Sequence, residues 1–303
     1  MPQTKQEGRY LNKNAILATK HRKADALRLP LKAGLGIKLR AYEIDTDKFG
    51  TFTGEIERQG SPIEAAVRKA RLAMSKSGEK LAFASEGSFG PHPLVPYMAF
   101  SQEFLVLLDE ELGIQVSESV LSTNTNFCHV EVHSIEEAED FLRRAKFPSH
   151  ALIVRPANFD TSFLDSVRRL VAGKRVAEPI YKGIHDREAL ASAILACRKV
   201  SIDGSVRIET DMRANMNPSR MRVLRALGIK LARRLRCTCP ECGCPGFGMT
   251  GKEGVLPCEE CGFPSDAHAN EIHSCPRCGY SEAFPRKDGF TSIEALFCQR
   301  CNP

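Results

Sequence analysis

The feature that most constrains this chain is a set of four C-x-x-C pairs near its C-terminal end. Of the 12 cysteines in 303 residues, ten come after residue 236. The pairs are Cys239/Cys242, Cys258/Cys261, Cys275/Cys278 and Cys298/Cys301. In a chain without an export signal, cysteines at this spacing are typical of metal sites rather than of disulfides.

Eight thiolates are the ligand set of two tetrahedral Cys₄ sites. Such closed all-cysteine sites are structural, so we predict two structural Zn²⁺ ions in a small zinc-ribbon module over residues 237–303. In the C-P-x-C-G form, the turn directs backbone N–H groups at the sulfurs, and glycine accepts a positive φ after the second cysteine. The simplest combination is sequential, the first pair with the second and the third with the fourth, while an interleaved one stays open. Cys237 and Cys244 are left over, and either could replace a neighbouring ligand.

The part of the chain before these pairs has the pattern of an α/β domain. Short apolar segments typical of strands alternate with segments of helical periodicity. Ser61–Glu64 forms a capping box that opens a helix, whose apolar stripe leaves Lys69 facing elsewhere, and Asn217-Pro218 opens a long second helix. A β-pair expected over residues 118–132 makes the sheet mixed. We therefore predict a mixed-sheet α/β domain over residues 1–236.

The segment Leu81–Pro93 combines an apolar strand with a polar turn. Leu81–Ala84 carries no charge, as a buried strand would, and Ser85–Pro91 then contains two glycines and a proline. We expect the strand to end near Ser85, which places the carboxylate of Glu86 at the carboxyl end of a buried strand. Ligands bind in this position in open α/β sheets, although an ordinary turn has the same pattern.

The junction before the long helix is a second candidate site. It is dense in side chains that form hydrogen bonds, among them Asp211, Arg213, Asn217 and Arg220. Together with the helix N-terminus, these groups could bind an anion such as a phosphate.

The long helix itself is strongly basic. Between residues 217 and 236 it has seven basic residues and no acid. One interpretation is a solvated face whose charges favour the helix dipole. The other is a phosphate-facing surface beside the zinc module, which predicts nucleic-acid binding through residues 220–303.

Composition limits the classes of partner. Apolar content of 42% with 26% charged residues is ordinary for a soluble globular protein, and no apolar run is long enough to span a membrane. The segment Met1–Lys23 is polar and basic without an apolar signal region, which indicates a cytoplasmic chain. The formal charge of +6 falls to about +2 when eight thiolates bind two Zn²⁺, so the overall charge is only a weak argument for nucleic acid.

Three short motifs occur in an order that resembles a known family. A first strand ends at Thr19 with Lys23 four residues on, a helix opened by an acid carries Arg68-Lys69, and the strand in Phe83–Gly87 ends in an acid and a glycine. Over residues 15 to about 110, these motifs are similar to those of the house-cleaning nucleoside-triphosphate pyrophosphatases, which hydrolyse inosine and xanthosine triphosphates.

The resemblance implies the α/β fold of this family, with a cleft, and a role for each matched residue. The residues that would contact phosphates are Thr19, Lys23, Arg68 and Lys69. Glu86 would hold a catalytic Mg²⁺. A paired acid next to Glu86 is missing, so we expect the second catalytic carboxylate elsewhere, with Glu55 as the first choice; His21 stands where the family usually has Asn.

Three functional hypotheses follow. The first is an Mg²⁺-dependent pyrophosphohydrolase for nucleoside triphosphates with non-standard purines, which also carries a structural zinc module. The alternative is a zinc-ribbon nucleic-acid-binding protein whose α/β domain binds a nucleotide without catalysis. The third is a zinc-stabilised oligomer, such as a homodimer, with no chemistry.

Overall fold

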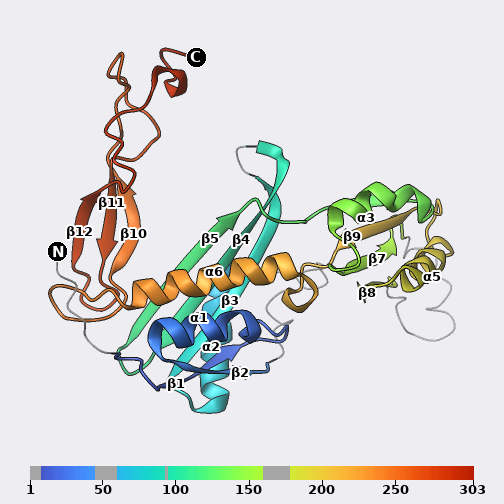
Figure 1. The fold of residues 1–303 in the computed structure, drawn as a ribbon, viewed down its shortest axis with the longest axis horizontal. Helices are drawn as coiled ribbons and strands as arrows, with labels where there is room; N and C mark the ends of the chain where they lie inside the picture. Colours follow the sequence, from blue (N-terminus) through green and yellow to red (C-terminus); the bar gives the residue numbers. More distant parts are fainter. Residues whose placement is uncertain (1–7, 45–59, 93–94, 160–177) are drawn as a thin grey trace, which may run out of the picture.

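Five strands of the N-terminal part form the central sheet of the molecule (Figure 1). The computed structural model describes residues 8–44, 60–92, 95–159 and 178–303. In the order β2-β1-β3-β4-β5, β1 is parallel to β2 and β3, whereas β4 is antiparallel to β3 and β5. These strands are β1 (Asn14–Ala18), β2 (Lys38–Tyr42), β3 (Leu81–His92), β4 (Val95–Asp109) and β5 (Ile114–Ser122). The prediction of a mixed α/β fold is thus confirmed.

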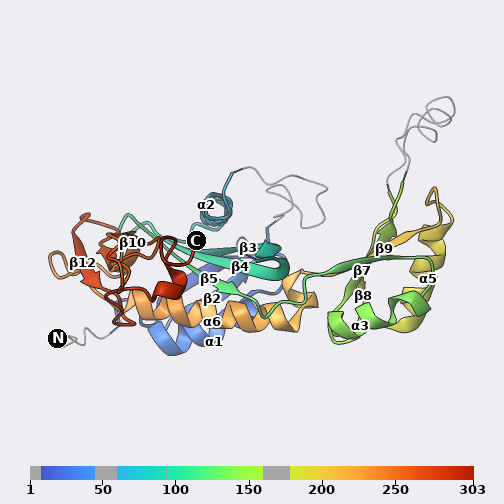
Figure 2. The same cartoon turned by 90° about the horizontal axis from the view of Figure 1, so that it is seen from above.

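Helices cover both faces of this sheet, as Figure 2 shows. α1 (Ala24–Leu35) and α6 (Pro218–Leu235) lie side by side on one face, and α2 (Pro62–Ser77) lies on the other. Leucines repeat with the helical period in α1 and α6, and their buried side chains form the main apolar cluster with the sheet. Gly34 lets the two helices pack closely, because a Cβ at this position would lie 2.7 Å from the Cβ of Ala232.

The helix α2 begins at the predicted capping box. The hydroxyl of Ser61 accepts a hydrogen bond from the backbone N–H of Glu64, whose carboxylate accepts one from the backbone N–H of Ser61. Small residues such as Ala66 and Ala70 form the side of α2 that packs on the sheet. Lys69 is buried beside them, so the prediction that it faces elsewhere is wrong: its ammonium group reaches a carboxylate on the sheet.

A second, four-stranded sheet lies beside the first and is inserted in the chain between β5 and α6 (Figure 1). Its order is β6-β9-β7-β8, with all neighbours antiparallel. Its elements are β6 (His129–Val132), η2 (Glu136–Ala138), α3 (Glu139–Ala145), β7 (Leu152–Pro156), β8 (Tyr181–Ile184), α5 (Arg187–Arg198) and β9 (Val206–Thr210), followed by η3 (Ala214–Met216). This unit has an apolar cluster of its own.

The structure corrects two expectations about these strands. The expected β-pair over residues 118–132 does not form, because β5 ends at Ser122 and β6 joins the second sheet at His129. The strand expected to end near Ser85 continues instead to His92. The reason is that β4 pairs with β3 along its length and supplies hydrogen bonds through the segment that resembles a turn.

The C-terminal module begins directly after α6. Its three strands form an antiparallel sheet of order β10-β11-β12 (Figure 1). Its elements are β10 (Gly248–Glu253), β11 (Asn270–Ser274), β12 (Ser281–Pro285) and η4 (Ala295–Phe297). In the part of the chain that the structure describes, none of the helices combines the length and the apolarity needed to cross a membrane.

Candidate functional site

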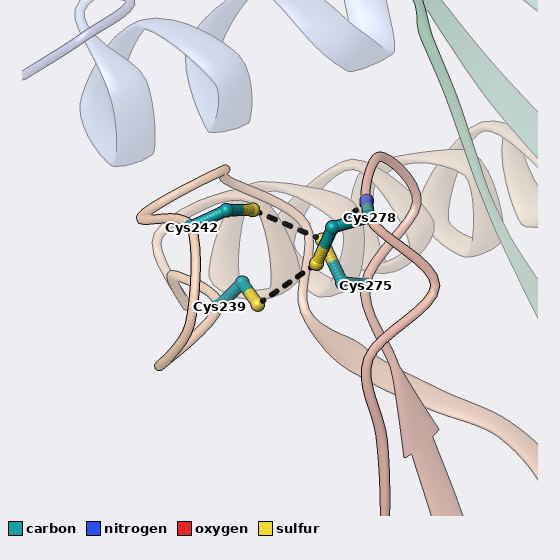
Figure 3. Close-up of side chains that lie close together, drawn as sticks. All are labelled: Cys239, Cys242, Cys275 and Cys278. Carbon is teal, nitrogen blue, oxygen red and sulfur yellow. Dashed lines mark hydrogen bonds between the residues drawn. The ribbon is translucent and has the colours of Figure 1, made fainter.

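The first cysteine cluster joins the end of α6 to the turn between β11 and β12 (Figure 3). It consists of Cys239, Cys242, Cys275 and Cys278, whose sulfur atoms all lie within 4.8 Å of one another. The sulfurs of Cys239 and Cys278 are 3.7 Å apart, and those of Cys242 and Cys275 are 3.6 Å apart. Four sulfurs around a zinc ion, each at the usual distance of ~2.3 Å, would be ~3.8 Å apart. The cluster therefore has the ligand set and the size of a tetrahedral metal site.

The second cluster consists of Cys258, Cys261, Cys298 and Cys301. The sulfurs of Cys258 and Cys301 are 3.9 Å apart, and those of Cys261 and Cys298 are 3.7 Å apart. The pairs thus interleave, the first with the third and the second with the fourth, and the sequential combination is wrong. The hairpin of β10 and β11 returns the chain to the first pair and leaves the second pair at the other end of the sheet, which the chain reaches again after β12.

The backbone around the cysteines has the predicted geometry. The glycines that follow the first three pairs have φ angles of 66°, 67° and 73°: Gly243, Gly262 and Gly279. The backbone N–H groups of Arg277 and Cys278 point at the sulfur of Cys275, at 3.4 and 3.5 Å. Burial raises the pKa of the Cys275 thiol, but the two N–H groups, together with hydrogen bonds from the thiols of Cys278 and Cys242, outweigh this effect and bring the pKa down to about 6. The thiolate, which is the form that binds metal, is thereby favoured.

Two cysteines of the C-terminal module lie outside both clusters. Cys244 is buried in the main apolar core beside the first cluster, and burial together with the neighbouring Cys275 and Cys242 raises its pKa to about 11. Cys237 is exposed at the end of α6. His273 packs on the ring of Phe284, with 4.8 Å between ring centroids, and belongs to neither cluster.

A separate candidate site lies where β1 ends within the first sheet. β1 pairs with β3 as far as Ala18 opposite Ala84, and β3 continues beyond that point. The chain enters α1 on one face after β1 and enters α2 on the other face before β3. The order β2-β1-β3 therefore creates a topological switch point, outside which ligand crevices of open α/β sheets are found.

Lys23 lies at this switch point. Its Nζ donates a hydrogen bond of 2.8 Å to the backbone carbonyl of Ser85, which follows the last β3 residue paired with β1. Burial and the nearby Arg220 lower the pKa of Lys23 to about 8, while Glu86 and Glu103 act in the opposite direction. The hydroxyl of Ser85 is buried and has no hydrogen-bond partner among the described residues. The end of β1 thus presents a partly desolvated cation beside an unused hydroxyl group.

On the α2 side of the sheet, Glu86 forms an ion pair with Lys69. The Glu86 side chain is 13% exposed and that of Lys69 is 8% exposed. Because β3 extends from Leu81 to His92, Glu86 lies in the middle of this strand, and the prediction that it lies at the end of a strand is wrong. Because β1 stops two residues earlier in the register, at Ala84, the carboxylate still lies just beyond the end of a parallel neighbour.

On the opposite side, Arg220 and Glu103 form a buried ion pair that the sequence analysis missed. Glu103 is fully buried on β4, and the Nε of Arg220 lies 2.5 Å from its Oε1. Gly87 pairs with Glu103 in the sheet, and a Cβ there would lie 2.6 Å from Nη2 of Arg220. Arg220 also stacks over Phe89 at 5.0 Å from the ring centroid and donates to the carbonyl of Met212. The available signal for Glu103 was its position directly before the apolar run Phe104–Leu108 of the same strand.

A comparison with protein families matches residues 69–303 to the family described as Domain of unknown function (DUF6671). This match covers well over half of the chain. The chain is a member of the DUF6671 family. No curated protein matches it. Among solved structures, the DUF6671 chain is similar to protein VC0702 from Vibrio cholerae, with a TM-score of 0.26 and 8% identity over 37% of this chain, and it spans 65% of that protein's length.

The junction before α6 in the DUF6671 chain is held by internal bonds. Asp211 is fully buried and forms an ion pair with Arg213. Asn217 caps α6 as predicted: its Oδ1 accepts from the backbone N–H of Arg220 at 2.9 Å, and its Nδ2 donates to Asn126 at 2.8 Å. Because these side chains bond to the protein itself, phosphate binding by them stays a prediction.

The other predicted phosphate ligands lie near the same end of the sheet. Thr19 is buried directly after β1, and its hydroxyl accepts a hydrogen bond from the backbone N–H of His21 at 3.3 Å. Arg68 is half-buried in α2 and lies near Glu64. Glu55 lies outside the described residues of the DUF6671 chain.

Proposed function

We propose that the crevice at the end of β1 binds the phosphates of a nucleoside triphosphate and that the protein hydrolyses the bond between the α- and β-phosphates. The observation that carries this proposal is the convergence of Lys23, Lys69 and Glu86 at one topological switch point. The resemblance to the house-cleaning pyrophosphatases assigns phosphate and Mg²⁺ contacts to these same residues. On this proposal, the first sheet and its helices have the mixed-sheet fold of that family.

The charges of the crevice favour an anionic ligand. Lys23, Lys69 and Arg220 bring three cations to a region with two carboxylates, Glu86 and Glu103. With its pKa at about 8, Lys23 is still mostly charged at neutral pH. A bound phosphate would favour its charged form further, and partial desolvation strengthens the attraction relative to water.

Glu86 is the described carboxylate that fits a role in binding Mg²⁺ in the crevice. Glu103 is fully buried and held by Arg220, whereas Glu86 is partly exposed and its partner Lys69 could move to a phosphate oxygen. One or two carboxylates are enough, because Mg²⁺ completes its shell with water and phosphate oxygens. When bound, Mg²⁺ offsets phosphate charge and orients the attacking water. Lys23 and Lys69 would hold the phosphates in position for the attack.

We also propose that each cysteine cluster holds Zn²⁺ in a structural role. Four thiolates complete the shell of the ion, so neither site keeps the open position that a catalytic zinc requires. Cys239 and Cys275 are part of the main apolar core, which means that the first ion would fix the end of α6 against the sheet.

The test of the proposed hydrolysis is a panel of nucleoside triphosphates with Mg²⁺, in which the release of pyrophosphate or phosphate is measured. Wild-type protein should turn over at least one of them, and Glu86→Gln should lose about 100-fold or more of this activity because the carboxylate that holds the ion is gone. Glu110→Gln is the matched control, since Glu110 is exposed just after β4, and it should keep wild-type activity. The proposal fails if wild-type protein hydrolyses no triphosphate and binds nucleotides as tightly as Glu86→Gln does.

A further inference from the structure

The basic residues of α6 divide into two groups. Three of them bond to acids of the first sheet: Arg220 to Glu103, and both Lys230 and Arg234 to Glu118. The other four are exposed and form no ion pair among the described residues: Arg222, Arg225, Arg233 and Arg236. Acids of the first sheet thus neutralise the first group, whereas the four arginines of the second group keep their positive charge in solvent.

The four exposed arginines form one stripe along the outer side of α6. At 3.6 residues per turn, their positions fall within about 80° around the helix axis and extend over ~21 Å along it. Ile229, which is 41% exposed, lies in the same stripe between Arg225 and Arg233. Since α6 and α1 form the outer layer on this face of the sheet (Figure 2), the stripe faces away from the protein.

The neighbouring helix α1 adds no unpaired negative charge beside this stripe. Pro30 of α1 packs against Gly228 of α6, which places the two helices in direct contact. The one acid of α1, Asp25, is paired with Arg22 and also lies near Arg28. The arginine stripe of α6 therefore has no unpaired acid of α1 beside it.

The cysteine module does not share this charge. Around the second cluster, three exposed acids, Glu259, Glu260 and Glu294, outnumber the one exposed base within the cysteine pairs, Arg300. These acids would repel a phosphate backbone. The structure therefore favours α6, and not the zinc ribbon, as the surface for a polyanion.

We propose that the outer face of α6 binds the phosphate backbone of duplex DNA through its four exposed arginines. The guanidinium group is planar and donates paired hydrogen bonds to phosphate oxygens, which suits it to this contact. The stripe presents Ile229 but no aromatic ring, so it offers nothing on which the bases of a single strand could stack.

The spacing of the arginines favours a B-form duplex. They fall into two pairs, Arg222/Arg225 and Arg233/Arg236, whose centres lie ~16 Å apart along the helix. The major groove of B-DNA is about 12 Å wide, so the two pairs can contact phosphates on either side of it. The major groove of duplex RNA is narrow and deep and does not offer this span.

The experiment is a titration of a 5′-labelled duplex DNA of random sequence, followed by fluorescence anisotropy at several salt concentrations. Four phosphate contacts predict a slope of about −3.6 for the logarithm of the binding constant against that of the salt concentration. Arg225→Gln/Arg233→Gln should bring the slope to about −1.8, because two contacts are lost. Glutamine forms helices about as well as arginine, so α6 should stay intact.

The matched control removes the same charge from another exposed surface. Arg144→Gln/Arg198→Gln, in α3 and α5 of the second sheet unit, should bind with the wild-type slope. Equal slopes for the two double variants would overturn the proposal, as would equal affinity of the wild-type protein for duplex RNA or single-stranded DNA. Nucleotide hydrolysis should be unchanged in Arg225→Gln/Arg233→Gln, so a failure of DNA binding can be told apart from a failure of the proposed crevice function.

Discussion

At the scale of the residue, the buried ion pair between Arg220 and Glu103 depends on Gly87. The carboxylate of Glu103 and the guanidinium of Arg220 are both removed from water, and each compensates the other. A Cβ at Gly87 would lie 2.6 Å from Nη2 of Arg220 and 2.9 Å from Oε1 of Glu103. Because Arg220 also bonds to the carbonyl of Met212, it cannot move aside without losing a second contact.

Gly87→Ala is therefore expected to lower the free energy of unfolding by about 2–4 kcal/mol, since a methyl group would separate a buried ion pair. The measurement is urea denaturation at equilibrium. Gly90→Ala is the matched control on the same strand, because a Cβ there meets no atom within 4 Å, and it should change the free energy by less than about 0.5 kcal/mol. Similar losses in the two variants would show that the ion pair does not depend on the glycine.

At the scale of the element, the interleaved and the sequential combinations of cysteine pairs predict different zinc contents for double variants. Cys239→Ser/Cys275→Ser removes two ligands of the first cluster and should leave one zinc per chain. Cys239→Ser/Cys258→Ser damages both clusters and should leave none. Cys237→Ser, outside both clusters, is the control and should keep two. The zinc content per chain is measured by elemental mass spectrometry. One zinc per chain in Cys239→Ser/Cys258→Ser would contradict the interleaved combination and support the sequential one.

Elements with local signals could be predicted from the sequence, and elements that depend on a distant partner could not. The capping box at Ser61–Glu64 and the cap at Asn217 are formed by neighbouring residues, so the starts of α2 and α6 were predicted correctly. The continuation of β3 past Ser85 depends on hydrogen bonds from β4. The buried position of Glu103 likewise depends on its ion pair with Arg220, which lies 117 residues away in the chain. The combination of the cysteine pairs depended on strands β10 to β12, which the sequence analysis did not predict.

At the scale of the whole molecule, α6 connects the three parts of the chain. At its start, Asn217 bonds to Asn126 before the second sheet. Along its length it packs on α1 and the first sheet. At its end, Arg234 donates to the carbonyls of Gly246 and Ser117, at 3.1 and 3.0 Å, and so ties the first cysteine cluster to β5. The first cluster thus belongs to the main core, whereas Cys258 and Cys298 are in none of the apolar clusters of the described residues.

This difference predicts unequal effects of the two cysteine clusters on the stability of the core. Cys239→Ser/Cys275→Ser should lower the midpoint of thermal unfolding, because the first cluster no longer holds the end of α6. The midpoint is measured by far-UV circular dichroism. A loss of about 3 kcal/mol corresponds to about 6–12 °C for a unit of this size. Cys258→Ser/Cys298→Ser, which removes the same number of ligands, should shift the midpoint by less than about 2 °C, because neither cysteine belongs to an apolar cluster that contains the described helices. Equal shifts would mean that the second cysteine cluster, and with it the whole C-terminal module, folds as one unit with the α/β core.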